Sequence, residues 1–354
     1  MSRFLASKLC SLDAYTPGEQ PRDSVYIKLN TNESPFPPSP GVAAAVTEAA
    51  QTLNLYSDPT CYDLNAAAAE YYGVSPEEIL MTNGSDEILS FAFQAYGEDG
   101  FVFPDITYGF YPVFARLYGI DYETVPLTEN FAVAPGAYRN IGKSIVIANP
   151  NAPTGMALTV SEIEDIVASN PDHAVIIDEA YIDFGGQTCL PLIRKYDNLL
   201  VTRTFSKSFS LAGARLGFGI GNPALIADLN RIKYSTNPYN INRMTMAAGT
   251  AALKEHTYYE ENCRQIAQTR ENTTQALRQL GFSVTDSVSN FLFAAHPAVD
   301  GDTLYRRLKE KRILVRHFDA PRIRNYNRIT VGTAPQMDAL LRAVKEILKE
   351  CGCQ

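Results

Sequence analysis

The chain has 354 residues, of which 45% are hydrophobic and 20% are charged. This composition is ordinary for a globular protein and excludes an intrinsically disordered or fibrous chain. The length is near the size at which one hydrophobic core divides, so we expect about two domains. With 39 acidic and 31 basic residues the net charge is −8, so we expect no nucleic-acid partner.

The sequence offers no sign of a membrane or an export route. Apolar runs stay short of the ~18 residues that a spanning helix needs, and residues 1–15 lack the apolar core of a signal peptide. The 6 cysteines are scattered, so we expect free thiols in a reducing cytoplasm. The 4 histidines show no HxxxH spacing, and we expect no metal site.

Residues 1–40 are expected to form an arm without helix. Four prolines crowd its end, at positions 35, 37, 38 and 40, and proline is excluded from helix interiors. Two interpretations stay open for this segment, a loose terminus and an arm laid across the body or across a partner subunit.

Residues 41–245 alternate between helical and strand patterns. Helices are expected at 41–53, 64–72, 85–97 and 161–170, and strands at the end of 77–83 and at 101–104, 144–149, 173–178 and 198–205. Continuous apolar runs of this length are typical of strands buried on both faces of a parallel sheet. The pattern predicts a large α/β domain whose mostly parallel sheet is flanked by helices.

Residues 246–354 are expected to form a small α+β domain. A long helical stretch spans 246–281, interrupted at most once, and helices follow at 301–311 and 337–350. Short strands are expected at 282–286, 290–295, 313–318 and 328–332. The predicted organisation is therefore an N-terminal arm (1–40), a large domain (41–245) and a small C-terminal domain (246–354).

Polar clusters follow the buried strands, where open α/β sheets bind their ligands. The first, 83–86, combines a glycine with a helix start, which suits an anion although it could be a plain helix cap. The second, 149–155, is a loop stiffened by two prolines that presents Asn151. The third begins with Asp178, and a carboxylate at the end of an apolar strand needs a cationic partner or a salt bridge.

The fourth cluster, 204–209, centres on Lys207. A partly buried lysine can act as a nucleophile toward a carbonyl, and Arg215 follows eight residues later, where it could hold a phosphate. Together the clusters supply an anion cradle, an aromatic ring, an asparagine, an aspartate and a lysine. That set suits pyridoxal 5′-phosphate, which needs a lysine for its aldehyde and an acid for its pyridine nitrogen.

Ten motifs extend this pattern over nearly the whole chain. They are YTPG (15–18), KLNTNESPFPP (28–38), YSDP (56–59), NGSDE (83–87), TYGFY (107–111), NPNAPTG (149–155), DEAYIDF (178–184), RTFSKSFSLAGARLGF (203–218), ILVR (313–316) and RITVGT (328–333). In this order the sequence resembles the fold-type I pyridoxal-phosphate-dependent aminotransferases of class I/II, and within them the histidinol-phosphate aminotransferase family.

The resemblance implies a role for each matching residue. Lys207 would bind the cofactor covalently and move the proton, and Asp178 would pair with the pyridine nitrogen. Tyr181, the third implied catalytic residue, would hydrogen-bond the phenolic oxygen of the cofactor ring together with Asn151. The implied cofactor-binding residues are Gly84, Ser85, Asp86, Tyr108, Asn151, Asp178, Tyr181, Thr204, Ser206, Lys207, Arg215 and Tyr56. Tyr56 would reach the cofactor phosphate of the neighbouring subunit, which implies a homodimer with shared active sites.

For the substrate, the resemblance implies Tyr15, Asn151, Arg316 and Arg328. The two arginines would hold the anionic end, a carboxylate in glutamate and a phosphate in histidinol phosphate, and a planar guanidinium suits both. The implied reaction converts histidinol phosphate and 2-oxoglutarate to imidazole acetol phosphate and glutamate, a step of histidine biosynthesis. Ser34, Ser57 and Ala152 depart from the family pattern without removing a group that this reaction needs.

Three alternatives remain at this point. A threonine-phosphate decarboxylase shares the fold, although YTPG stands where those enzymes often have an HGG-type segment. An aromatic-amino-acid aminotransferase would use the same chemistry. A non-catalytic regulator would need a DNA-binding module before the body, for which about 40 proline-rich residues leave no room.

Overall fold

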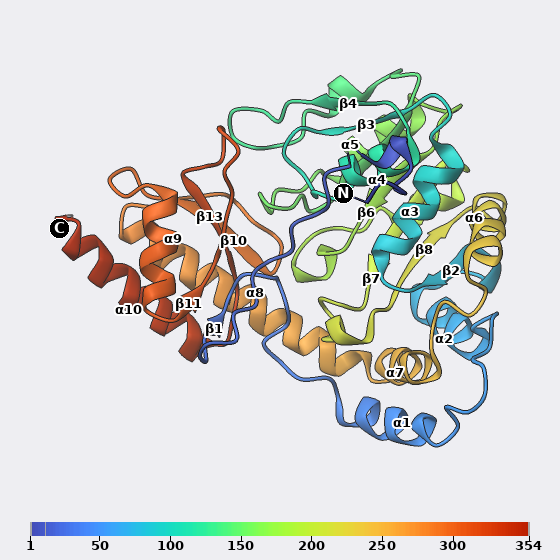
Figure 1. Cartoon of the computed structure of the whole chain (residues 1–354), viewed down its shortest axis with the longest axis horizontal. Coiled ribbons are helices and arrows are strands. Elements are labelled where there is room, and N and C mark those ends of the chain that lie inside the picture. Colours follow the sequence, from blue (N-terminus) through green and yellow to red (C-terminus); the bar gives the residue numbers. More distant parts are fainter. Residues whose placement is uncertain (1, 11, 353–354) are drawn as a thin grey trace.

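A seven-stranded sheet forms the centre of the computed structural model, which describes residues 2–10 and 12–352 (Figure 1). Its strand order is β2-β8-β7-β6-β5-β3-β4, and β8 runs antiparallel to both of its neighbours while the other pairs are parallel. The strands are β2 (Ile79–Thr82), β3 (Phe101–Pro104), β4 (Tyr122–Val125), β5 (Ser144–Ala148), β6 (Val175–Asp178), β7 (Leu199–Thr204) and β8 (Gly217–Gly221). The predicted α/β fold with a mostly parallel sheet is confirmed.

Helices cover both faces of this sheet, which is why its strands are apolar without alternation. On one face lie α2 (Tyr62–Tyr72), α5 (Val160–Ala168) and α7 (Arg243–Lys254), with α1 (Pro40–Ala50) packed outside α7. On the other lie α3 (Ser85–Tyr96), α4 (Tyr111–Tyr118) and α6 (Pro223–Thr236). Within β6, Val175 and Ile177 enter the first core while Ile176 enters the second.

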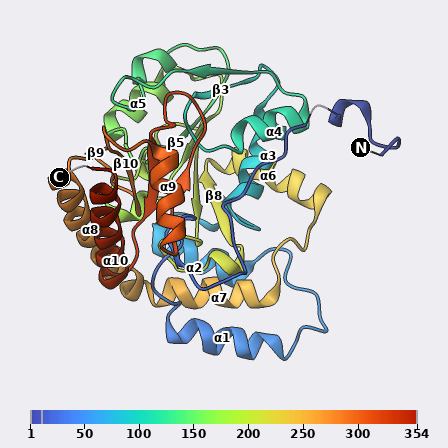
Figure 2. The ribbon, with the colours of Figure 1, turned by 60° about the vertical axis from the view of Figure 1, so that its left-hand side comes forward.

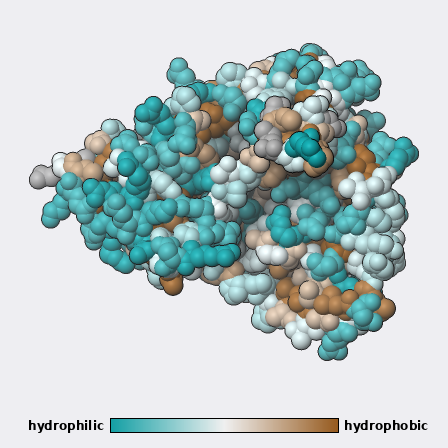
Figure 3. All heavy atoms as spheres, viewed as in Figure 1, coloured by the Kyte–Doolittle hydropathy of each residue, from teal (hydrophilic) through white to brown (hydrophobic). Residues whose placement is uncertain are grey.

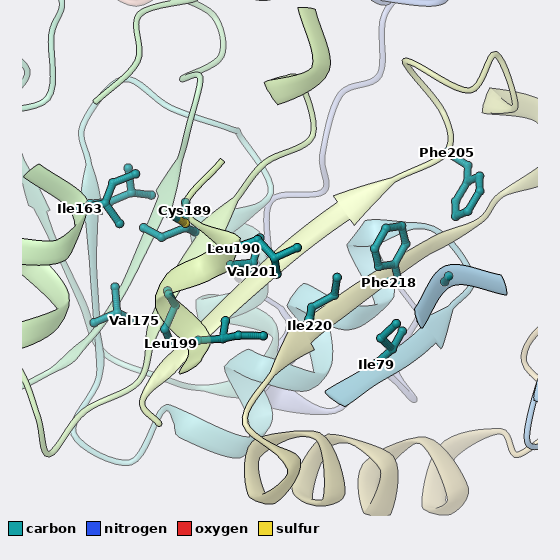
Figure 4. Close-up of a cluster of buried hydrophobic side chains, with 14 of the residues drawn as sticks. Ile79, Ile163, Val175, Cys189, Leu190, Leu199, Val201, Phe205, Phe218 and Ile220 are labelled. Carbon is teal, nitrogen blue, oxygen red and sulfur yellow. The ribbon is translucent and has the colours of Figure 1, made fainter. Parts of the chain in front are cut away.

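Figure 4 shows how the first core spans the sheet from β2 to α5. Ile79, Phe218 and Ile220 come from its β2–β8 edge, and Val175 and Ile163 lie at the far side of the same cluster. This continuous apolar layer fixes the strand ends relative to one another, and those ends carry the polar clusters.

A second, smaller layer, made of an antiparallel sheet and its helices, lies beside the large sheet (Figure 2). Its antiparallel sheet has the order β12-β13-β10-β9, and its core is separate from the two cores of the large sheet. The strands are β9 (Ser283–Val284), β10 (Phe291–Ala295), β12 (Arg316–His317) and β13 (Tyr326–Thr330). The helices are α8 (His256–Gln279), α9 (Gly301–Glu310) and α10 (Ala334–Glu350).

Helix α8 connects the large sheet with its helices to the smaller layer. The long helical stretch breaks once, at Glu255 between α7 and α8. Leu253 of α7 belongs to the first core, whereas Ile266 of α8 belongs to the core of the smaller layer. The expected boundary between residues 245 and 246 falls inside α7, and the expected small domain ends at residues 353–354, outside the described residues.

The N-terminal arm crosses from one body to the other. Its strand β1 (Ile27–Lys28) pairs in parallel with β11 (Ile313–Leu314), so the expected strand 313–318 is divided between two sheets at Val315. Several other elements escaped the sequence analysis, namely β4, β8, α4, α6 and the short 3-10 turns Ser7–Leu9, Pro76–Glu78, Pro135–Tyr138, Ile182–Phe184, Leu190–Arg194 and Ala212–Ala214. Among residues 2–10 and 12–352, no helix is both long and apolar enough to cross a bilayer.

Candidate active site

A cavity of about 650 Å³ opens where the strand ends of the large sheet meet the arm and the smaller layer. It gathers residues from the arm, from the loops after β2, β3, β6 and β7, and from β12 and β13. Of the expected site residues, it is lined by Tyr15, Ser85, Asp86, Tyr108, Asp178, Tyr181, Thr204, Ser206, Lys207, Arg215, Arg316 and Arg328. Tyr15 and Arg328, which are 313 positions apart in sequence, therefore line the same cavity.

Asp178 is buried at the end of β6 without a cation. Its carboxylate accepts hydrogen bonds from the Tyr111 hydroxyl (3.1 Å), the Thr202 hydroxyl (3.2 Å) and the Ala180 N–H (3.3 Å). None of the ion pairs within the described residues involves it. Burial raises the pKa of Asp178 to about 6, against the effect of these three donors. The site thus leaves a buried acid in need of a positive partner.

Lys207 follows β7 and projects into the cavity beside Tyr181. Its Nζ atom lies 5.7 Å from the centre of the Tyr181 ring and makes a long contact of 3.4 Å with the Thr31 carbonyl. Tyr181 is held in turn by Asn32, whose Nδ2 donates to the Tyr181 hydroxyl at 3.0 Å. The lysine is thus oriented by the arm and by the loop after β6 while its amine keeps free hydrogen-bonding capacity.

The start of α3 forms a cradle suited to a small anion. Gly84 has a φ of +79°, which glycine adopts without strain, and the helix then begins at Ser85. A Cβ on Gly217 of β8 would lie 2.2 Å from the Ser85 nitrogen, so the absence of a side chain there lets β8 pass directly beneath the helix start. The first N–H groups of a helix lack partners within the helix and attract anions.

Arg215 closes this cradle from the opposite side. Its backbone is left-handed, with a φ of +56°, and its guanidinium lies 3.6 Å from Asp86. Asp86 also accepts a hydrogen bond of 2.7 Å from the Tyr108 hydroxyl. Burial and the nearby Asp86 carboxylate raise the pKa of Tyr108, so its hydroxyl stays protonated and donates. One carboxylate therefore orients both a cation and an aromatic ring at the cavity wall.

Arg316 and Arg328 form a second cationic region. They are direct partners in the antiparallel register of β12 and β13, a placement in which like charges repel. Neither forms an ion pair with a carboxylate of the described residues. Arg316 donates to the Thr16 and Pro17 carbonyls (3.1 and 3.2 Å), and Arg328 donates to the Asn30 carbonyl (3.1 Å).

The buried Nε atom of Arg328 has no hydrogen-bond partner among residues 2–10 and 12–352. Burial lowers the pKa of Arg328, as expected when a cation is removed from water without a counter-charge. Two facing guanidiniums with spare donors are a site that a small dianion would stabilise.

Tyr15 brings the arm over the cavity. Its ring stacks on Phe110, with the ring centres 4.4 Å apart, and lies 6.2 Å from the ring of Tyr108. The arm is anchored further on by Glu19, which accepts hydrogen bonds from Tyr305 and Lys309 of α9. The arm therefore forms one wall of the cavity.

Three expected site residues lie outside the lining. Gly84 lies next to Arg215, which does line the cavity, and a Cβ on Gly84 would be 2.6 Å from the Nη2 atom of Arg215. Asn151 is buried, and its Nδ2 donates to the Ile106 carbonyl and the Thr154 hydroxyl at 3.0 and 3.1 Å, so its expected contact with the cofactor ring stays a prediction. Tyr56 is distant from its own cavity, and its side chain is 79% exposed.

Sequence reasoning missed four supporting residues. Tyr111 and Thr202 hold Asp178, Asn32 holds Tyr181, and Thr31 contacts Lys207. Tyr111 was within reach, because it closes the TYGFY motif, and Asn32 and Thr31 lie in the KLNTNESPFPP motif. Their partners are remote in sequence, however, and only the fold reveals the contacts.

Comparison with known proteins identifies the family and supports the fold. The model of the family "Aminotransferase class I and II" matches residues 24–344. This chain belongs to the class I and II aminotransferases. It is 48% identical over 353 residues to a histidinol-phosphate aminotransferase from Brachyspira hyodysenteriae, covering 99% of this chain and 100% of that protein. A second histidinol-phosphate aminotransferase, from a Marinomonas species, is 47% identical and covers 98% of this chain and 100% of that protein.

A solved aminotransferase gives the same result at the level of structure. The crystal structure of histidinol-phosphate aminotransferase from Sinorhizobium meliloti, in complex with pyridoxal 5′-phosphate, has a TM-score of 0.84 at 26% identity and covers 92% of each chain. Class I and II aminotransferases depend on pyridoxal phosphate, and the family resemblance drawn from the motifs is confirmed.

Proposed function

We propose that this aminotransferase moves an amino group between histidinol phosphate and 2-oxoglutarate, giving imidazole acetol phosphate and glutamate. One observation carries the choice of substrate. Arg316 and Arg328 face each other without a carboxylate partner, in the same cavity as Lys207 and Asp178. Such a pair accepts the phosphate of one substrate and the distal carboxylate of the other.

The residues of the cavity fit pyridoxal phosphate. The cradle of Gly84, Ser85 and Arg215 would hold the phosphate, and Ser206 and Thr204 lie at the same wall. The Asp178 carboxylate would accept a hydrogen bond from the protonated pyridine nitrogen, and this positive charge would be the partner that the buried acid lacks. When bound, the cofactor supplies an aldehyde that takes up the amino group and a ring that withdraws electrons from the substrate carbon.

Lys207 performs the proton transfer of each half-reaction. Its amine would take the proton from the substrate Cα, hold it on Nζ, and give it up again to complete the transfer. Tyr181, 5.7 Å from Nζ and held by Asn32, limits the positions that the amine can take. The two half-reactions balance, because the amino group leaving one substrate is the one that the second substrate gains.

The substrate is oriented by its anionic end. Arg316 and Arg328 hold that end, while the Tyr15 ring covers the entrance from the arm. Both arginines already bond to arm carbonyls at Thr16, Pro17 and Asn30. Binding of an anion and placement of the arm are therefore coupled, which helps to exclude water.

Aromatic amino acids are a second candidate class of donor. The cavity wall includes Tyr15, Tyr108, Tyr181 and Phe318, and these rings would pack equally well against imidazole or phenyl groups. The phosphate distinguishes the two classes, because an uncharged ring has nothing to offer the two guanidiniums.

The direct test is a transamination screen with 2-oxoglutarate. Histidinol phosphate, phenylalanine, tyrosine and threonine phosphate serve as donors, with glutamate and carbon dioxide as readouts. We expect kcat/KM for histidinol phosphate to exceed that for phenylalanine by about 100-fold or more. Comparable values would favour the aromatic-amino-acid enzyme, and carbon dioxide released from threonine phosphate would favour the decarboxylase.

The proposed enzyme is a cytoplasmic homodimer with shared active sites. Tyr56 does not line the cavity of its own chain and is exposed, and in a dimer it would reach the cofactor phosphate of the partner subunit. Figure 3 shows hydrophobic residues gathered on the surface over α1, and the segment after α1 exposes Leu53, Leu55 and Tyr62. Exposed apolar groups of this kind are typical of surfaces that pair.

A further inference from the structure

The segment between α1 and α2 places Tyr56 on an unusually constrained backbone. Leu55, Tyr56 and Asp58 are exposed and belong to no helix or strand, so such a segment would ordinarily be mobile. The Tyr56 ring is nevertheless stacked on Tyr239, with the ring centres 4.7 Å apart and the planes at 23°.

Two cations donate hydrogen bonds to backbone carbonyls of this segment. Arg243, the first residue of α7, donates from Nε to the Leu55 carbonyl at 3.2 Å and from Nη2 to the Tyr56 carbonyl at 2.7 Å. Lys233 of α6 donates from Nζ to the Pro59 carbonyl at 2.6 Å. Hydrogen bonds from charged donors are stronger than those between neutral groups, so these three contacts restrain the backbone of the segment.

Lys233 is costly where it lies. Its side chain is 2% exposed, and none of the ion pairs between described residues includes it. A buried ammonium without a carboxylate loses more hydration than a single carbonyl returns. A methionine of similar length would fill the same space with less penalty. The charge of Lys233 holds the Pro59 carbonyl by a hydrogen bond and also attracts the Asp58 and Glu87 carboxylates, the first of which lies in the same segment.

Asp58 fixes the end of the segment in the same way. Its carboxylate accepts hydrogen bonds from the N–H groups of Thr60 and Tyr62, both at 2.9 Å. The two cations thus bind backbone carbonyls of the segment, and Asp58 binds backbone N–H groups at its end. Tyr56 lies within this restrained segment, and its side chain is exposed.

We infer that Lys233 and Arg243 are positioning residues that present Tyr56 to the active site of the partner subunit. This inference rests on the proposed function, in which Tyr56 completes a shared site. A loop fixed before assembly loses less conformational entropy when it docks, and a displacement of about 1 Å at a site can cost about 100-fold in rate. The two cations therefore act on the partner's turnover and leave that of their own chain unaffected.

Hybrid dimers separate these two effects. One chain carries Lys207→Ala and cannot turn over, so all activity comes from the other chain, whose site is completed by Tyr56 of the Lys207→Ala chain. The two chains bear different affinity tags and are purified as hybrids. Lys233→Met is placed either in the Lys207→Ala chain or in the chain with Lys207 intact, and Arg243→Met is tested in the same two positions.

We expect Lys233→Met in the Lys207→Ala chain to lower turnover at least about tenfold, and the same substitution in the other chain to change it less than about twofold. Equal losses in both arrangements, or a loss only with the intact chain, would overturn the inference. Arg231→Met is the matched control, because Arg231 is an exposed cation on the same helix, and it should have no effect in either arrangement.

A second readout needs no cofactor and no activity. Amide hydrogen exchange over residues 52–62 of the cofactor-free dimer should become at least about tenfold faster in Lys233→Met, while exchange in β5 and β6 stays unchanged. Unchanged exchange in the segment would contradict the positioning role. Failure of the proposed function looks different, since the unmodified dimer would then show no transamination or would sediment as a monomer.

Discussion

Asp178 is a buried carboxylate that the fold surrounds with neutral hydrogen-bond donors. Three neutral donors bond to its carboxylate, and none of them neutralises it. The pKa of Asp178, raised to about 6 by burial, lies above the value of about 3.9 expected in the unfolded chain. The folded protein therefore binds this proton more tightly, and the stability of the cofactor-free protein falls as pH rises from about 4 to about 6.

Asp178→Asn should consequently stabilise the cofactor-free protein at neutral pH. We expect a gain of about 1–2 kcal/mol in the free energy of unfolding at about pH 7.5, because the buried charge disappears while one hydrogen bond is weakened. The gain should vanish near pH 4, where the carboxyl is already protonated in the folded state. Urea unfolding at several pH values measures this, and a gain independent of pH would contradict the assignment. Transamination by this variant should be lost.

Lys207→Ala tests the residue that moves the proton. We expect loss of turnover by about 10⁴-fold or more, because both the attachment of the cofactor and the acid–base group are removed. The visible absorbance of the lysine-bound cofactor should disappear as well. Retained turnover would refute the assigned role of Lys207. Lys254→Ala, at the end of α7, is a control of the same residue type outside the cavity.

The principal site residues could be predicted because their chemistry conflicts with their local surroundings. Asp178 ends an apolar strand and Lys207 follows another, so each polar group demands an explanation at the sequence level. Asn32 and Tyr111 gave no such signal, since each lies in an ordinary polar or aromatic setting. Their contacts with Tyr181 and Asp178 arise from packing between segments 149 and 67 residues apart.

Among the elements, β8 illustrates why a strand can escape a pattern search. Its sequence Gly217–Gly221 holds three glycines and only two apolar residues, which is a poor strand by propensity. The strand nevertheless forms the penultimate position of the large sheet, and its first glycine lets the start of α3 lie directly against it. Local propensity is here sacrificed for the geometry of the anion cradle.

Gly217→Ala should therefore damage the cradle. The new Cβ would meet the Ser85 nitrogen at 2.2 Å and the Gly84 carbonyl carbon at 2.5 Å, so the backbone of the helix start has to move. We expect cofactor affinity to fall at least about tenfold and stability to fall by about 1–3 kcal/mol. Fluorescence titration and thermal unfolding measure the two effects.

Gly136→Ala provides the control for this substitution, because a Cβ at Gly136 meets nothing within 4 Å. This variant should bind the cofactor normally and match or exceed the stability of the unmodified protein. Normal cofactor affinity in Gly217→Ala would show that the close approach of β8 is not required for binding.

At the scale of the whole molecule, the net charge of −8 hides two cationic regions. Arg215 with the start of α3 forms one, and Arg316 with Arg328 forms the other, both within a single cavity. The expectation of no nucleic-acid partner, drawn from overall charge, stays a prediction, and overall charge could not predict where local cations gather. The division into a large and a small domain near residue 245 stays a prediction from length and from the change of pattern, and the first core extends past that position through α7.

Assembly is the property of the whole molecule that the surface predicts. Leu55 is 57% exposed, so Leu55→Glu should change the stability of a single subunit by no more than about 0.5 kcal/mol. In a dimer it would bury a charge, and we expect the dissociation constant to rise at least about tenfold. Sedimentation velocity across a concentration series measures this. Val25→Glu, on an exposed part of the arm, is the control, and equal behaviour of the two variants would place the contact elsewhere.

The pairing of β1 with β11 governs the order in which the chain can be completed during synthesis. Leu29 donates to the Leu314 carbonyl and accepts from the Thr330 N–H, each at 2.9 Å, so this part of the arm pairs with strands that are synthesised 285 to 301 residues later. The strands of the large sheet all lie between residues 79 and 221 and can assemble while translation continues. The arm can pair only when the strands near residues 314 and 330 have left the ribosome, so this wall of the cavity forms late in folding.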